Sequence, residues 1–320
     1  MKQINVIIDT DPGADDAIAL AALLKNPMFN VIGITSIGGN VDPQKTKRNA
    51  IGIADLMGRH DVPILAGATK PLHRPFEHAS YIHGETGVDG LTMDLARITE
   101  LEVRQPTQHA VDFIIEQSKI YDDLQLIIIG PMTNIAMAFK KDPSIKDRIK
   151  GLSIMGGAFG NPTGNSGADK QAEFNILCDP EAAEIVLDNF DNIRLLPLDV
   201  THAYLQTRET RNWMAGLSEQ GANFASMLQA YADAYSTFSD YKDVCPLHDF
   251  HAVAAVTNPE IWGWVQGKVT VSLTGEQTEG QTIFKPNTSR NVLVAKTLDV
   301  LAFDSMLRKQ LERALVENRD

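Results

Sequence analysis

Short runs of apolar, often β-branched residues alternate with amphipathic stretches along most of the chain. The first run, Ile4–Ile8, predicts a strand, and the stretch Asp15–Lys25 that follows it predicts a helix. Leu124–Ile129 is continuously apolar, as is typical of strands that are buried on both faces. The alternation continues through Val31–Ile37, Thr46–Met57, Thr107–Ile120, Thr133–Lys141, Leu152–Met155, Pro180–Phe190 and Ile193–Leu198. This order predicts an α/β fold with a single open, mostly parallel sheet flanked by helices.

The C-terminal third departs from this alternation. Arg208–Ser239 has a helical pattern and predicts a helical cap. Lys268–Leu273 and Thr282–Lys285 predict a small antiparallel extension of the sheet, and Leu298–Val316 predicts a closing helix. No internal repeat, low-complexity tract or clear linker divides the sequence. We therefore expect one domain over residues 1–320.

Composition and charge narrow the classes of partner. The 320 residues are 43% apolar, but no run approaches the roughly 18 residues that cross a bilayer, so no membrane partner is expected. The formal net charge is −12, and no stripe of lysine or arginine is present that would neutralise the phosphates of a nucleic-acid polymer. A neutral small molecule or a cation is a more suitable partner for a chain with this negative net charge. The first residues make a poor signal peptide, and Cys178 and Cys245 lie outside any CxxC pattern, so we expect a cytoplasmic protein without disulfides or zinc.

Polar residues gather where the predicted strands end. Four carboxylates, those of Asp9, Asp11, Asp15 and Asp16, follow the first strand within eight residues. Later strands are followed by Gly38-Gly39-Asn40, by Gly130-Pro131-Met132-Thr133-Asn134 and by a loop that ends in Glu173-Phe174-Asn175. Ligands of an open parallel sheet bind beyond the carboxyl ends of its strands, so these segments are expected to meet at one edge.

The four clustered carboxylates repel one another unless a positive charge lies among them. Capping of the following helix by Asp15 is the alternative, but capping does not explain Asp9 and Asp11. A hard divalent cation with oxygen ligands accounts for all four.

His248-Asp249 is a second polar signal, directly before the apolar stretch Phe250–Thr257. Taken alone, Asp249 is compatible with a helix cap and His248 with an ordinary surface residue. With the first cluster in view, this pair supplies a cation ligand from a distant part of the chain.

These motifs resemble the inosine-uridine preferring nucleoside hydrolase family over nearly the whole chain. The most specific element is the aspartate signature of residues 9–17, Asp-Thr-Asp-Pro-Gly-Ala-Asp-Asp-Ala. Further matches follow in the same order as in the family: Gly39-Asn40, Arg48-Asn49-Ala50, His83-Gly84, residues 130–136, residues 172–175 and His248-Asp249.

The resemblance implies a calcium ion as cofactor and a set of residues around it. It implies cation ligands from the side chains of Asp11, Asp16 and Asp249 and the backbone carbonyl of Ile129. It implies ribose contacts from Asp15, Asn40, Glu173 and Asn175, with His83 and His248 near the base. One departure is Gly167, where family members usually carry a ribose-contacting asparagine; Asn165 is the nearest candidate for that role. The family's habit also implies a homodimer or homotetramer.

The activity implied is hydrolysis of the N-glycosidic bond of purine and/or pyrimidine ribonucleosides to ribose and free base. A metal-activated water would attack the anomeric carbon, Asp11 would be its general base, and the sugar would become oxocarbenium-like. His248 would assist the departing base. The preferred base is not indicated.

Other residues and other classes of protein fit the pattern less well. Six histidines outside the motifs are interpreted as structural or solvated: His60, His73, His78, His109, His202 and His251. Tyr231, Tyr235 and Tyr241 are interpreted as packing residues, one of which could stack on a base. A phosphatase of the haloacid dehalogenase type would share Asp9-x-Asp11 but has no use for Asp15-Asp16. A non-catalytic nucleoside sensor would not require a cation that activates water.

Overall fold

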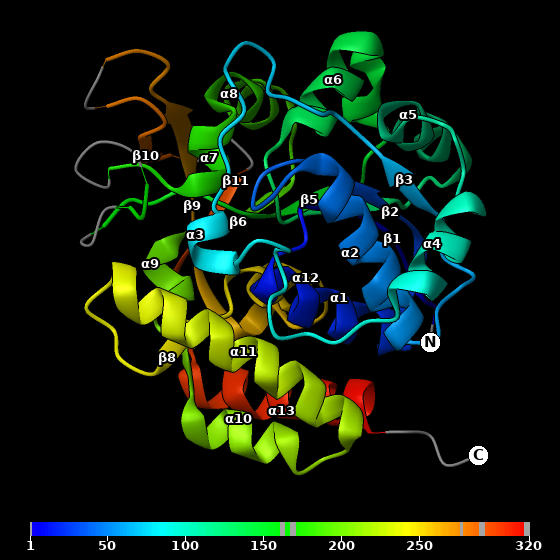
Figure 1. The fold of residues 1–320 in the computed structure, drawn as a ribbon. Helices are drawn as coiled ribbons and strands as arrows, with labels where there is room; N and C mark the ends of the chain where they lie inside the picture. Colours follow the sequence, from blue (N-terminus) through cyan, green and yellow to red (C-terminus); the bar gives the residue numbers. More distant parts are fainter. Residues whose placement is uncertain (1, 161–163, 167–170, 276–277, 288–291, 317–320) are drawn as a thin grey trace.

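The centre of the molecule is an open, mixed sheet, which the computed structural model describes together with its surrounding helices over residues 2–160, 164–166, 171–275, 278–287 and 292–316 (Figure 1). Among these residues the sheet has nine strands in the order β10-β9-β11-β6-β5-β4-β1-β2-β3. The strands are β1 Ile4–Thr10, β2 Phe29–Ser36, β3 Ile64–Ala66, β4 Gln125–Ile128, β5 Gly151–Met155, β6 Ile193–Leu196, β9 Trp262–Val271, β10 Thr282–Pro286 and β11 Val292–Leu298. Pairing is parallel from β3 to β11, and β9 then pairs antiparallel with both β11 and β10. The predicted fold class is confirmed.

Helices cover both faces of the sheet, as Figure 1 shows. The helices before residue 200 are α1 Ala14–Lys25, α2 Pro43–Leu56, α3 Ser80–His83, α4 Leu95–Val103, α5 Ala110–Ile120, α6 Thr133–Lys141, α7 Phe174–Cys178, α8 Pro180–Asn189 and α9 Leu198–Thr201. The later helices are α10 Arg208–Ala215, α11 Glu219–Phe238, α12 His248–Thr257 and α13 Val300–Leu315, and short 3₁₀ turns cover Pro143–Asp147 and Pro259–Ile261. No helix of the described residues is long and apolar enough to span a membrane.

Side-chain alternation along the central strands divides the core into two layers. Val6 and Ile8 of β1 pack with α1, α2, α12 and α13, whereas Ile7 between them packs with α5, α6 and α8. β4 alternates in the same way, with Ile127 in the first layer and Ile128 in the second. Both faces of these strands are therefore buried, which explains their continuous apolar sequence.

The chain after residue 200 is divided differently from the prediction. Arg208–Ser239 forms two helices, because α10 ends at Ala215 and α11 begins at Glu219 after its cap Ser218, whose side chain accepts a hydrogen bond from the Gly221 amide. Leu298 belongs to β11, and α13 begins only after Asp299, which caps it. β3, β11 and the two-stranded sheet of β7 Leu205–Thr207 and β8 Val244–Pro246 were not predicted.

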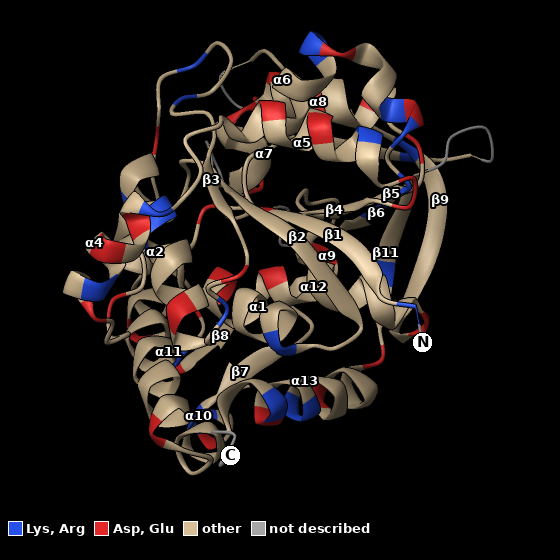
Figure 2. Cartoon of the chain, turned by 90° about the vertical axis from the view of Figure 1, so that its right-hand side faces the viewer, with Lys and Arg blue, Asp and Glu red and all other residues tan. Residues whose placement is uncertain are grey.

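Acidic and basic residues alternate along several helices in Figure 2, for example on α4 and α13. Several of them form short-range ion pairs, such as Arg97–Glu100 on α4 and Arg308–Asp304 on α13. Exposed pairs of this kind contribute little to stability and mainly keep the surface hydrated.

Candidate active site

A cavity of about 540 Å³ lies at the carboxyl ends of the parallel strands. Ile129 and Met155, which lie at the ends of β4 and β5, line it, and Asn40 lines it from the loop after β2. The predicted convergence of strand ends is therefore present. Of the residues predicted for the site, the lining includes Asp15, Asn40, His83, Ile129, Asn165, Glu173, Asn175, His248 and Asp249.

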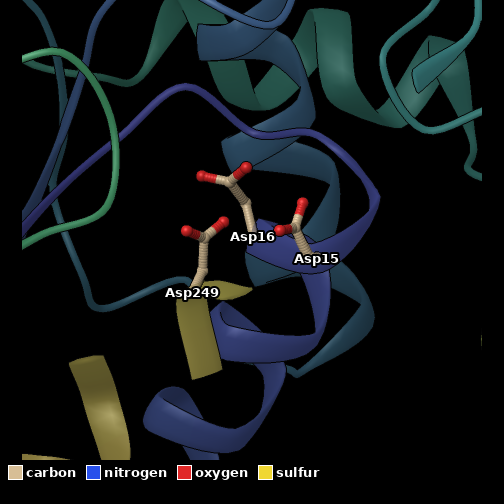
Figure 3. A group of neighbouring side chains, drawn as sticks. All are labelled: Asp15, Asp16 and Asp249. Atoms are coloured by element: carbon tan, nitrogen blue, oxygen red, sulfur yellow. The ribbon is translucent and has the colours of Figure 1, made fainter. Parts of the chain in front are cut away.

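The carboxylates of Asp15, Asp16 and Asp249 lie within 4.8 Å of one another, and Asp15 and Asp249 of this group line the cavity (Figure 3). Asp15 and Asp16 are in the first turn of α1, and Asp249 is in the first turn of α12. These two helices pack against each other, so residues far apart in the sequence meet here. All three side chains are buried.

Both capping alternatives are wrong. Gly13 precedes α1, and Asp16, not Asp15, accepts a hydrogen bond from its amide, at 2.9 Å. Asp249 makes no capping bond to α12, and His248 is buried rather than on the surface.

Burial together with mutual repulsion makes this group electrostatically unfavourable on its own. Burial, and then the neighbouring carboxylates, raise the pKa of Asp15 and of Asp249 well above its usual range. Burial also raises the pKa of Asp16, although Thr10 and Gly13 donate hydrogen bonds to it. A cation among the three would remove the repulsion and stabilise their charged forms.

Asp11 lies beside this group and below the cavity surface. Its Oδ2 accepts a hydrogen bond from the Asn40 amide at 2.7 Å, and Asn40 Nδ2 also donates to Asp16 at 3.0 Å. Oδ1 of Asp11 is buried and has no hydrogen-bond partner among the described residues. A Cβ on Gly39 would collide with Oδ2, and one on Gly130 would collide with Oδ1, so glycine at both positions makes room for the carboxylate. An unpartnered buried oxygen beside an all-oxygen donor group fits a hard divalent cation.

Asp9 is not part of this group, although its place in the sequence predicted that it would be. Its Oδ1 accepts hydrogen bonds from Thr35 of β2 at 2.5 Å and from Asn134 of α6 at 2.8 Å. Burial raises the pKa of Asp9 to about 7. Asp9 therefore joins β1, β2 and α6 through Oδ1, whereas its Oδ2 is buried without a hydrogen-bond partner among the described residues.

Glu173 and Asn175 form another part of the cavity lining. Glu173 caps α7 and accepts hydrogen bonds from the amides of Gly157, Asn175 and Ile176. Burial nevertheless raises the pKa of Glu173 to about 7. Asn175 Nδ2 lies 3.4 Å from the carbonyl oxygen of Ile129. Asn165 is on the cavity wall as predicted, whereas Gly167 lies outside the described residues.

Two histidines also line the cavity, and Nδ1 of His83 lies 4.0 Å from a carboxylate oxygen of Asp15. The Ala14 amide donates a hydrogen bond to Nδ1 of His83 at 3.2 Å, and the His83 ring stacks on Tyr231. Nδ1 of His248 lies 2.7 Å from Oγ1 of Thr201. Burial lowers the pKa of His83 to about 4 and that of His248 well below its usual range, so both rings are neutral near pH 7.

Part of this wall was not predicted from the sequence. His202, which was interpreted as structural or solvated, lines the cavity, packs edge-on against His248 and is hydrogen-bonded through Nε2 to the hydroxyl of Tyr235 at 2.9 Å. Tyr231 and Tyr241 also line the cavity. His202 follows strand β6 by a few residues, so the rule applied to the other strand ends would have found it.

The fold and the site define an α/β enzyme that handles a small polar molecule between a buried carboxylate group and a wall of histidine and tyrosine. The family comparison identifies the class. The chain belongs to the inosine-uridine preferring nucleoside hydrolase family, whose model matches residues 6–305, and it is a nucleoside hydrolase.

Individual relatives match over almost their whole length. An inosine-uridine preferring nucleoside hydrolase from Leishmania major is 35% identical, with 96% of this chain and 97% of the relative covered. A pyrimidine-specific ribonucleoside hydrolase from Citrobacter koseri is 33% identical, with the same coverage. Among solved structures, a purine-preferring ribonucleoside hydrolase from Gardnerella vaginalis has a TM-score of 0.87 at 32% identity, with 97% of this chain and 99% of that one covered.

Proposed function

We propose that the protein hydrolyses the N-glycosidic bond of purine and/or pyrimidine ribonucleosides to ribose and free base, with calcium as its cofactor. The observation that carries the proposal is one cavity that is lined both by members of a buried carboxylate group and by neutral histidines. A ribose with its hydroxyls suits the carboxylates, and a planar base suits the histidines. The relatives include enzymes named for purine, pyrimidine and mixed substrates, which supports the substrate class and leaves the base open.

The cation would be held by the side chains of Asp11, Asp16 and Asp249 and by the carbonyl oxygen of Ile129. All four donors are oxygen atoms, which favours calcium over zinc. Among the described residues, no cysteine or histidine belongs to the carboxylate group. When bound, such an ion lowers the pKa of a water molecule and offers coordination sites to vicinal hydroxyls.

Asp11 would act as the general base. Its Oδ2 accepts a hydrogen bond from the Asn40 amide, while its Oδ1 has no partner among the described residues, which leaves this carboxylate able to contact the cation and a water molecule beside it. Asp15, Asn40, Glu173 and Asn175, with Asn165 as a further candidate, would orient the ribose. Their oxygens would also stabilise the positive charge that develops on the sugar as the bond to the base breaks.

His248 would serve the leaving base, with His83 beside it. Both rings are neutral and line the same cavity as the proposed ribose ligands. A hydrogen bond to the departing base helps only as negative charge develops there, so it lowers the barrier without tightening binding of the intact nucleoside.

The direct test is release of base from uridine and inosine by the purified protein. We expect turnover of at least one, loss of turnover with a chelator, and recovery with calcium. Elemental analysis should find about one divalent ion per chain. We expect 2′-deoxynucleosides to react about 10⁴-fold more slowly in kcat/KM, because the site is built around hydroxyls. Binding of nucleosides without turnover would overturn the proposal in favour of a sensor.

The family resemblance further leads us to propose a homodimer or homotetramer. Light scattering on the purified protein would measure this directly.

A further inference from the structure

His248 is held in place by two consecutive residues at the end of α9. Thr201 contacts its Nδ1 through the side-chain hydroxyl at 2.7 Å, and His202 packs edge-on against its ring, with ring centroids 5.0 Å apart. Thr201 is completely buried and does not line the cavity. α9 itself is tied to the loop after β5, because the Leu198 amide donates to Gly157 and the Phe159 amide donates to Asp199. The contact to Nδ1 is therefore made from a fixed part of the fold.

The direction of the Thr201–His248 hydrogen bond follows from what each partner has available. Among the described residues, Nδ1 of His248 is the hydrogen-bond partner of the Thr201 hydroxyl. If Nδ1 carried the proton, the hydroxyl would accept, and its own proton would be buried without an acceptor. If the hydroxyl donates, Nδ1 accepts and no donor is left unsatisfied. A neutral imidazole carries one N–H, which then has to be at Nε2.

We propose that Thr201 is a positioning residue, which fixes His248 as the Nε2–H tautomer so that the nitrogen left for the cavity donates a hydrogen bond to the leaving base. The inference rests on the proposed function, because it specifies how His248 serves the base. Thr201 touches neither substrate nor cation, and no proton transfer is assigned to it.

His83 provides an independent instance of the same arrangement on this wall. Its Nδ1 accepts from a backbone amide, that of Ala14, and an amide can only donate. Nδ1 of His83 is therefore unprotonated, and its single N–H is at Nε2. His83 and His248 thus have their Nδ1 atoms occupied by donors from the protein, in one case a main-chain amide and in the other a hydroxyl. The hydroxyl is the one that a substitution can remove without changing the main chain.

The test compares Thr201→Val, which keeps the shape but removes the hydroxyl, with Thr201→Ser, which keeps the hydroxyl. The first measurement is the ¹⁵N spectrum of the histidine rings, in which the protonated and unprotonated nitrogens of His248 are distinguished. We expect Nε2–H in the wild type and in Thr201→Ser, and a shift of population toward Nδ1–H in Thr201→Val. His248→Gln assigns the signals.

The second measurement is kinetic. For uridine or inosine, Thr201→Val should lower kcat by about tenfold or more with KM nearly unchanged, because the donor acts in the transition state. For p-nitrophenyl riboside, whose leaving group departs without a donor, the loss should be much smaller. Thr201→Ser should recover most of the nucleoside rate.

Three results would overturn the proposal. They are Nδ1–H at His248 in the wild type, an equal loss on both kinds of substrate in Thr201→Val, and a Thr201→Ser variant as slow as Thr201→Val. The spectra separate this proposal from the proposed function, because they report the tautomer without turnover. Absence of nucleoside hydrolysis in the wild type would refute the function, while Nδ1–H in an active wild type would refute only the role of Thr201.

Discussion

The carboxylate half of the site (Asp11, Asp15, Asp16, Glu173 and Asp249) is built from strand ends and first helical turns. The histidine and tyrosine wall that adjoins it (His83, His202, Tyr231, Tyr235 and His248) is carried largely by the separate helices α3, α9 and α11. α12 contributes one residue to each, since His248 and Asp249 are adjacent. The first half is anchored by backbone amides and by hydrogen bonds to Asn40, and the second by ring packing and side-chain hydrogen bonds.

Burial has opposite effects in these two halves. In the carboxylate half it raises pKa values, so the acids lose charge unless a cation is bound. In the histidine and tyrosine wall it lowers the pKa values of the imidazoles, which are then neutral and available as hydrogen-bond donors or acceptors. The same loss of solvation thus prepares one half for a charged ligand and the other for a neutral, aromatic one.

The largest effect should come from Asp11→Asn in the carboxylate half. The variant keeps the volume of the side chain but removes the charge and the proton acceptor, so kcat should fall by more than about a hundredfold and calcium affinity should drop. Steady-state kinetics and calcium titration measure both. Asp9→Asn is the matched control, because Asp9 is a buried aspartate two positions away whose hydrogen bonds to Thr35 and Asn134 an amide oxygen can keep. Comparable losses in the two variants would show that any buried carboxylate near the end of β1 matters equally.

A smaller, more selective effect should follow from Tyr235→Phe in the wall. It removes the hydrogen bond to His202, and a hydrogen bond between neutral groups contributes about 1 kcal/mol. The ratio of kcat/KM for inosine to kcat/KM for uridine should therefore change by about fivefold. Calcium affinity should be unaffected. Tyr204→Phe removes the hydrogen bond of another largely buried tyrosine, to Asp304, but Tyr204 does not line the cavity, so the ratio should stay at the wild-type value. A change in calcium affinity with an unchanged ratio would mean that the two halves are not separable.

The smallest effect should be a pH-dependent thermal stabilisation by calcium. A carboxyl group whose pKa is raised on folding, such as Glu173 at about 7, stabilises the fold below its unfolded pKa, and this stability is lost as the pH rises toward the folded pKa. The histidines act in the opposite sense. His83, at about 4, contributes stability above the unfolded pKa of 6.5 that is lost as the pH falls toward 4.

Calcium should therefore raise Tm more at pH 8 than at pH 5, where the acids of the carboxylate half hold protons. The extra rise in Tm should be a few degrees, since a change of about 1 kcal/mol in the free energy of unfolding shifts Tm by roughly 2–4 °C in a protein of this kind. Calorimetry of chelated and calcium-loaded protein at both pH values gives the answer. An equal rise at both would show that the ion does not compete with protons at this site.

The two halves also differ in how far the sequence predicts them. The carboxylates follow strands whose apolar runs are easy to recognise, and parallel strand ends necessarily meet, so Asp15 and Glu173 could be placed from the order of residues alone. Asp9 was misplaced because β1 extends to Thr10. Asp9 therefore lies inside the strand, where it pairs with Thr35 and Ile128. The direction of its side chain is set by the alternation of side chains between the two faces of the sheet.

The wall could not be assembled in the same way, because its members come from helices whose packing is decided by tertiary contacts. Tyr231 and Tyr235 are one helical turn apart on α11, a spacing equally typical of core packing. That His83 stacks on Tyr231 depends on α3 lying against α11, and no local pattern encodes this contact. β11 was not predicted for a similar reason. Its pairing with β6 and β9 depends on the arrangement of the whole sheet and not on the residues next to β11 in the sequence.

His83 accepts a hydrogen bond from the first residue of α1, the helix that carries Asp15 and Asp16, and its ring lies on Tyr231. A displacement of that helix start would be transmitted directly to the ring. Thermodynamic coupling of this kind is reciprocal. If the cation tightens binding of a free base by some factor, the base tightens binding of the cation by the same factor. If the proposed cation and base bind at these places, the position of His83 would link the affinity for the cation to the identity of the base.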